Sequence, residues 1–322
     1  MYIPPALPPL EVMPKDVSGL RRGNVGIDYV HRFTADQPGP HVVINALTHG
    51  NEFCGMTAVT WLMDQGARPT RGTWTLSFAN VAAYERFDPA RPLDSRFVDR
   101  DFNRAWGADV LANDRQSSEA RRARELAPVF SAADALLDIH STTFAVRPMM
   151  VYGQLEKARR LATALKSPAT HVITPGAKHQ GGLLIEFDGF GDPASPQTAL
   201  VVECGQHFAR SSGIVAIQTM LRFLDHFGTL DRDFADEHIL PLSSEVRSIY
   251  EISEVRICRN QQARFVRPLE GFEEFAAGEL IGSDGEREIR APYDNCAVLM
   301  PKAQLVPGRE MVTLARRQQE PG

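Results

Sequence analysis

Two histidines and a glutamate are the residues of this chain whose types and placement could bind a catalytic metal ion. His49 and Glu52 stand three positions apart, directly after the apolar run of residues 42–47, and His140 closes a second run that begins at residue 135. Two imidazoles and one carboxylate supply three ligands and leave the fourth position of a tetrahedral zinc ion to water. We therefore expect one Zn²⁺ ion at these residues, although the same ligand types accept other divalent ions.

Glu203 could act as a base beside that ion. It ends a third apolar run at residues 199–202. Ligands bind open α/β sheets at the carboxyl ends of the strands, so Glu203 should lie near the two histidines. There it could take a proton from water and deliver it to a departing amine. A single His-x-x-Glu pair arises often by chance, and the shared strand-end placement is what favours a site.

A charged loop at residues 94–104 offers groups that could recognise an anion. Arg104 presents a planar fork of donors that suits a carboxylate, and Asn103 adds a neutral donor beside it. We expect these two residues to hold a carboxylate of the substrate. The alternative is a solvated surface loop, which is the commoner fate of charge-rich segments.

The elements that must position these residues alternate between strand and helix from about residue 24 to residue 230. Residues 72–79, 135–139 and 199–202 have strand patterns, and residues 55–65, 117–130 and 215–227 have helical spacing. This alternation predicts an α/β fold, with a mixed, largely parallel sheet flanked by helices. Residues 80–106 form a long polar loop, and loops of that length in a compact domain are often functional.

The composition and the hydrophobic pattern of the sequence change after residue 230. Residues 231–237 have the composition of a linker, and short alternating segments follow at residues 246–252, 263–266 and 296–300, separated by glycine and proline. These features predict a smaller C-terminal all-β domain. We expect a catalytic domain over residues 1–237 and a β-rich domain over residues 238–322.

Composition limits the class of partner. The chain has 43% hydrophobic and 23% charged residues and a net charge of −5, with no basic stripe for nucleic acid. No run approaches the ~20 apolar residues of a membrane span, and the first ten residues lack the basic start of a signal peptide. We therefore expect a cytoplasmic protein with a small-molecule substrate and neither a nucleic-acid nor a membrane partner. A homo-oligomer is compatible with the sequence, which does not specify the oligomeric state.

For the cysteines and for His207, a structural role is more common than a catalytic one. Cys54, Cys204, Cys258 and Cys296 lack CxxC spacing, and we expect them to be small buried hydrophobic residues, although two lie next to the site. His207 could line the pocket, but a histidine exposed or at a helix start is the commoner case.

Several blocks of the chain resemble the succinylglutamate desuccinylase/aspartoacylase family, a branch of the zinc carboxypeptidase clan. They occur in the family's order and at similar separations: His49-Gly50-Asn51-Glu52, Arg96, Asp101-Phe102-Asn103-Arg104, Asp138-Ile139-His140-Ser141-Thr142-Thr143 and Glu203-Cys204-Gly205-Gln206. The resemblance spans about residues 40–210, and the β-rich tail is similar to the family's C-terminal domain. Five ordered blocks are far more specific than any one of them.

The resemblance implies a role for each block. It makes His49, Glu52 and His140 the zinc ligands and Glu203 the general base. The implied activity is hydrolysis of the amide bond of an N-acyl amino acid or a related carboxylate-bearing amide.

The same resemblance implies roles for residues of the charged loop. Arg96 would polarise the scissile carbonyl and stabilise the oxyanion. Asn103 and Arg104 would bind the α-carboxylate of the substrate, and Asp101 would orient a ligand histidine.

Two departures from aspartoacylase bear on the substrate. Aspartoacylase has a further arginine shortly before the catalytic glutamate, but residues 187–199 contain none. Its C-terminal tyrosine would fall near Leu299, although Tyr293 lies close by. These differences argue against N-acetylaspartate as the substrate.

Two rival functions stay open at this point. One is a zinc carboxypeptidase that acts on peptides, and the other is a metal-bearing binding protein without catalysis. A protein that only binds metal does not need Glu203, so this residue argues against the second alternative.

Overall fold

The apolar runs form the centre of a mixed sheet in the computed structural model, which describes residues 9–175, 182–302 and 305–318. Among these residues, eleven strands pair in the order β1-β3-β2-β4-β7-β5-β6-β8-β14-β13-β10. The strands from the first two thirds of the chain are β1 (Val30–Thr34), β2 (His41–Ala46), β3 (Thr73–Phe78), β4 (Ala135–Thr142), β5 (Met149–Tyr152), β6 (Thr170–Ile173) and β7 (Thr198–Gln206). The four strands β3, β2, β4 and β7 run parallel, which confirms the predicted α/β sheet.

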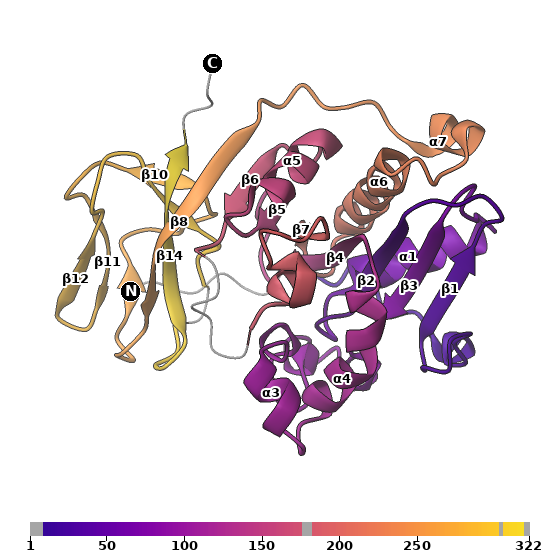
Figure 1. The fold of residues 1–322 in the computed structure, drawn as a ribbon. Helices are drawn as coiled ribbons and strands as arrows, with labels where there is room; N and C mark the ends of the chain where they lie inside the picture. Colours follow the sequence, from indigo (N-terminus) through magenta and orange to yellow (C-terminus); the bar gives the residue numbers. More distant parts are fainter. Residues whose placement is uncertain (1–8, 176–181, 303–304, 319–322) are drawn as a thin grey trace.

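Helices cover both faces of this sheet (Figure 1). Their bounds are α1 (Phe53–Asp64), α2 (Val81–Tyr84), α3 (Ala108–Asn113), α4 (Ser118–Ser131), α5 (Glu156–Leu165), α6 (Arg210–His226) and α7 (Arg232–His238). Helices α1, α5 and α6 pack together on one face, and α4 packs on the other with α3 beside it. The predicted helices at residues 55–65, 117–130 and 215–227 are confirmed within a few residues at most boundaries, but α6 begins five residues earlier than predicted.

Alternation along the strands decides which side chains reach the α4 face. Leu136 and Val201 pack in the core under α4, whereas Leu137 and Val202 pack in the core under α1 and α6. Because successive side chains of a strand point to opposite faces, positions that share parity with Leu136 and Val201 also lie on the α4 face. The polar residues at the carboxyl ends of β4 and β7 therefore share that face.

The C-terminal part of the chain extends the same sheet and adds a second one. Its strands are β8 (Ser248–Ile257), β9 (Arg264–Phe265), β10 (Glu273–Phe275), β11 (Leu280–Asp284), β12 (Arg287–Arg290), β13 (Cys296–Leu299) and β14 (Glu310–Gln318). The first residues of β8 pair with β6, and most of its length pairs with β14. Strands β12, β11 and β9 form a separate antiparallel sheet. The predicted β-rich C-terminal region is confirmed.

The predicted linker at residues 231–237 is wrong. The segment forms the helix α7, whose Asp231 side chain accepts a hydrogen bond from the backbone N–H of Phe234 at its N-terminus. The rings of Phe234 and His238 pack against Trp61 of α1, at 6.1 and 5.4 Å between ring centroids. The extended connection to β8 comes after α7 (Figure 1). The domain boundary near residue 238 stays a prediction, because β8 continues the sheet.

The long polar segment at residues 80–106 is anchored by one buried carboxylate. It contains α2 and two 3₁₀ turns, η2 (Asp94–Arg96) and η3 (Phe102–Arg104). Glu119 of α4 is fully buried and accepts hydrogen bonds from the backbone N–H groups of Val98 (2.6 Å), Asp99 (3.1 Å) and Arg100 (3.2 Å). A carboxylate that gathers several N–H donors is held firmly, so the loop has a fixed position against α4.

Candidate metal centre

The turn after β2 brings His49 and Glu52 to the edge of the sheet. A Cβ atom on Gly50 would lie 2.4 Å from the backbone of Ala83, Tyr84 and Ser95, so this turn has no room for a side chain. The N–H of Gly50 also donates to the carbonyl of Arg96 at 3.0 Å. The turn is thereby attached to the charged loop that follows α2.

His140 and Glu203 lie side by side on neighbouring strands. They are direct partners in the parallel register of β4 and β7. Both belong to the α4 face by the parity described above. The expectation that the strand ends gather these residues is met by this register.

His49, Glu52 and His140 form a tight buried group. One possible ligand atom from each residue lies within 4.8 Å of the others, and each residue is at most 2% exposed. The Nδ1 atom of His49 is 2.8 Å from one oxygen of Glu52, and the Nδ1 atom of His140 is 3.0 Å from the other. Both imidazoles therefore present Nδ1 to the same carboxylate.

The other ring nitrogen of each histidine faces an aspartate. Nε2 of His49 lies 3.0 Å from Asp101, and Nε2 of His140 lies 2.7 Å from Asp138. A metal-binding histidine usually donates its second N–H to a carboxylate, which frees the first nitrogen as a ligand. Because both histidines have such a carboxylate, the three side chains fit one divalent cation.

Asp138 is a site residue that the sequence analysis did not single out. It is fully buried, and its Oδ1 accepts hydrogen bonds from Asn45 Nδ2 (2.8 Å) and Thr48 Oγ1 (2.7 Å). Asn45 in turn accepts from Ser77 at 2.6 Å. The available signal was its position two residues before His140, which places both side chains on one face of the strand.

Electrostatics in the group favour a positive charge between the carboxylates. Burial opposes ionisation of Glu52, but the two facing histidines outweigh it and hold the pKa of Glu52 well below its ordinary value. Burial also opposes protonation of His140, but Asp138 and Glu52 outweigh it and raise the pKa of His140 well above its ordinary value. A site that retains positive charge despite burial is suited to a cation.

Arg96 reaches the group from the charged loop. Its guanidinium donates to Glu52 at 3.2 Å and to Asp101 at 3.1 Å, and its side chain is 40% exposed. Burial opposes the charge of Asp101, but His49 and Arg96 outweigh it and lower the pKa of Asp101. Arg96 thus lies where the protein meets solvent at the metal group.

Asn103 and Arg104 lie beside Asp101 on the turn η3. The Asp101 side chain accepts from the backbone N–H of Asn103 at 2.9 Å, and Asn103 Oδ1 accepts from the N–H of Leu184 at 3.1 Å. Arg104 donates to the carbonyl of Asn103 at 2.8 Å, and both residues are half-buried. The structure brings the two residues together within a loop that Asp101 links to His49.

Glu203 has an oxygen without a protein partner. Its Oε2 atom is buried and has no hydrogen-bond partner among the described residues. Burial raises the pKa of Glu203 to about 7. A buried carboxylate oxygen that lacks a partner is costly, and such groups are common where a proton is transferred.

The sequence interpretation of His207 as an exposed or helix-start residue is wrong. The side chain is buried, with 3% exposure, and burial lowers its pKa to about 4. All four cysteines are buried and free, as expected, and Cys54 donates to the carbonyl of His140 at 3.2 Å.

The two C-terminal residues considered as counterparts of the aspartoacylase tyrosine have the following partners. Tyr293 contacts Ser253, and the guanidinium carbon of Arg316 lies 3.8 Å from the centre of its ring. Leu299 is fully buried and packs in a core cluster with Val146.

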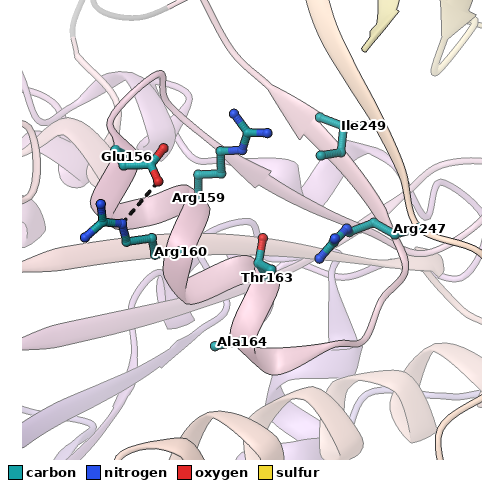
Figure 2. Close-up of a pocket in the computed structure, with 7 residues that line it drawn as sticks. All are labelled: Glu156, Arg159, Arg160, Thr163, Ala164, Arg247 and Ile249. Atoms are coloured by element: carbon teal, nitrogen blue, oxygen red, sulfur yellow. Dashed lines mark hydrogen bonds and ion pairs between the residues drawn. The ribbon is translucent and has the colours of Figure 1, made fainter. Parts of the chain in front are cut away.

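A surface hollow lies elsewhere, between α5 and the first residues of β8. Its volume is about 470 Å³. Its lining includes Arg159, Arg160 and Arg247 (Figure 2). Arg160 pairs with Glu156 at 3.1 Å across this surface. The hollow contains none of the residues assigned above, so it is separate from the candidate metal centre.

Comparison with known proteins relates part of the chain to one family. Residues 38–174 match the model of the succinylglutamate desuccinylase/aspartoacylase catalytic domain. A probable aspartoacylase of Parasynechococcus marenigrum is 35% identical over 155 residues, 45% of this chain and 49% of the relative. An N-acyl-aromatic-L-amino acid amidohydrolase of Xenopus laevis is 35% identical over 115 residues, 33% of this chain and 35% of the relative. The matches thus span half or less of these curated relatives.

Solved structures agree with the fold. A succinylglutamate desuccinylase from Vibrio cholerae superposes with a TM-score of 0.67 at 17% identity, over 90% of this chain and 86% of that one. One from Chromobacterium violaceum gives a TM-score of 0.66 at 16% identity, over 92% and 91%. Residues 38–174 therefore match the catalytic domain of the succinylglutamate desuccinylase/aspartoacylase family.

Proposed function

We propose that the protein is a zinc-dependent amidohydrolase that removes the acyl group from an N-acyl amino acid or a related carboxylate-bearing amide. The observation that carries the proposal is the pairing of the three-donor group with the Glu203 oxygen that has no hydrogen-bond partner in the described part of the chain. The names of the relatives support the substrate class, since one is named a probable aspartoacylase and another an N-acyl-aromatic-L-amino acid amidohydrolase.

His49, Glu52 and His140 would hold the ion. A divalent cation bound there would supply Lewis acidity toward a carbonyl oxygen and would make water more acidic. Asp101 and Asp138 keep each Nδ1 atom available, because their carboxylates engage the Nε2–H groups. The proton on each Nε2 is thus held in place, so Nδ1 is the nitrogen that can lose its proton and bind an ion.

Glu203 would move the proton. Its free Oε2 atom can accept a proton from attacking water and return it to the nitrogen of the departing amine. The pKa near 7 that burial gives this carboxyl suits both halves of the transfer at neutral pH. A protein that only binds metal would gain nothing from this buried carboxylate.

Arg96 would stabilise the negative charge that develops on the carbonyl oxygen. Its guanidinium is already held by Glu52 and Asp101, so little reorganisation is needed during the reaction. Asn103 and Arg104 would bind the α-carboxylate and fix the distance between it and the scissile bond. The link from Asp101 to Asn103 couples this clamp to the metal centre.

The remaining expectations about partners stay predictions from the sequence. Among the described residues, no helix is both long and apolar enough to span a membrane. A small-molecule substrate follows from the proposed chemistry, whereas the cytoplasmic location and a homo-oligomeric state are proposals without a structural test.

A screen of N-acyl amino acids, with metal analysis of the same preparation, tests the function. We expect one equivalent of zinc and hydrolysis of amides that carry a free α-carboxylate. Matched peptides serve as the comparison. Faster hydrolysis of peptides than of acylated amino acids would favour a carboxypeptidase instead.

A further inference from the structure

His207 is a buried imidazole that the proposed reaction leaves without a role. It follows β7, where Gly205 adopts a φ of +104° that favours glycine. The backbone N–H of His207 donates to the carbonyl of Thr142 at 2.8 Å, so the chain after β7 is attached to the end of β4. The ring is 3% exposed.

The two ring nitrogens of His207 have unequal partners. Nδ1 lies 2.8 Å from Ser141 Oγ, whereas Nε2 lies 3.4 Å from Thr143 Oγ1. The first distance is typical of a good hydrogen bond, and the second is beyond the usual range. Nδ1 therefore makes the stronger contact.

Ser141 connects this contact to the metal group. It follows His140 directly, and its backbone N–H donates to Oε2 of Glu52 at 3.2 Å. The same oxygen faces Nδ1 of His140 at 3.0 Å. The N–H of Ser141 thus helps to fix the Glu52 oxygen that lies next to His140.

We propose that His207 is a positioning residue for the metal-binding carboxylate of Glu52, acting through Ser141. By holding the Ser141 hydroxyl, His207 keeps the backbone N–H of Ser141 aimed at Glu52. This inference rests on the metal site of the proposed function.

The charge state of His207 is compatible with this role. Burial lowers the pKa of His207 to about 4, so the imidazole is neutral at pH 7 and does not repel a nearby cation. A histidine that serves packing alone would need only its shape, which phenylalanine approximates.

Affinity for Zn²⁺, measured by competition with a chromophoric chelator, tests the proposal. We expect His207→Phe and Ser141→Ala each to weaken binding by about 10-fold, as is typical when a residue that supports a metal ligand is lost. The double variant should be little weaker than either single one, because both changes break one linkage. Asparagine places an amide near the position of Nδ1, so His207→Asn should retain affinity within about 3-fold.

The control is His31→Phe, which removes another buried histidine whose ring contacts the carbonyl of Leu20 on the far edge of the sheet. Its zinc affinity should equal that of the unaltered protein. If His207→Phe does not fold, Ser141→Ala still decides the question, since it removes one hydroxyl.

Two results would overturn the proposal. One is unchanged affinity in Ser141→Ala, and the other is additive losses in the double variant. If the unaltered protein itself binds no zinc, the proposed function fails, so the two failures are distinguishable.

Discussion

Replacing Asp138 with asparagine should invert the tautomer of His140. Oδ1 of Asp138 accepts from both Asn45 and Thr48, so the carbonyl oxygen of the new asparagine must occupy that position. Its NH₂ group then faces Nε2 of His140, which lies 2.7 Å from Asp138 Oδ2. Two donors cannot share that contact, so Nε2 must lose its proton and the remaining proton of the ring must stay on Nδ1. A protonated Nδ1 cannot bind a metal ion.

The expected loss of zinc affinity follows from the free energy needed to keep His140 in the tautomer that binds metal. If His140 keeps the tautomer that binds metal, one buried donor is left unpaired, which costs about 1–3 kcal/mol. At ~1.4 kcal/mol per factor of ten, zinc affinity should fall roughly 5- to 140-fold. The typical loss of about 10- to 100-fold for such partners lies within this range.

Competition titration with a zinc chelator measures the effect in Asp138→Asn. The matched control is Asp134→Asn, which alters the carboxylate that accepts from the backbone N–H of His41 before the start of β4. This control should bind zinc as tightly as the unaltered protein. A folded Asp138→Asn variant with full zinc affinity would refute the tautomer argument.

Three further predictions concern the base, the clamp and acid stability. Glu203→Gln should keep zinc affinity but lower kcat by about 10²- to 10⁴-fold. A variant whose turnover rate stays near that of the unaltered protein would show that Glu203 is not the general base. Arg104→Ala should raise KM for N-acyl amino acids but not for their α-methyl esters, and equal effects on both substrates would contradict a carboxylate clamp. The pKa of His207 falls from 6.5 to about 4 on folding, so in the metal-free protein the unfolded chain binds its proton more readily between these values. His207 should therefore support full stability above pH 6.5 and cost about 3 kcal/mol by pH 4, at ~1.4 kcal/mol per pKa unit. Denaturant unfolding should show less acid sensitivity in His207→Asn, and identical pH profiles would count against the buried neutral imidazole.

The long apolar runs made the centre of the fold predictable. Strands β2, β4 and β7 are buried on both faces, so their sequences are continuous hydrophobic runs that end at polar residues. Those ends are His140, Glu203 and the turn that carries His49. The register that pairs His140 with Glu203 could not be predicted, because it depends on contacts between segments about sixty residues apart.

Residues whose partners lie far away in the chain escaped the sequence analysis. Glu119 resembles any charge in the first turn of a helix, yet it anchors the loop before α3. Asp138 was visible only as part of a motif until Asn45 and Thr48 were seen to donate to it. His207 is neutral and buried because β7 and β4 meet, which its neighbours in sequence do not reveal.

Residues 231–237 form the helix α7 instead of the predicted linker for a local reason and a tertiary one. The charged composition of residues 231–237 is typical of a solvated connection, but the Asp231 side chain caps the N-terminus of a helix. Contacts of Phe234 and His238 with Trp61 stabilise a helix too short to persist alone.

A zinc-soaked crystal, examined at the zinc absorption edge, tests the central claim most directly. We predict one anomalous peak, from a zinc ion that lies about 2.0–2.2 Å from Nδ1 of His49, Nδ1 of His140 and an oxygen of Glu52. An empty site in such a crystal, or a zinc ion held by other residues, would contradict the account.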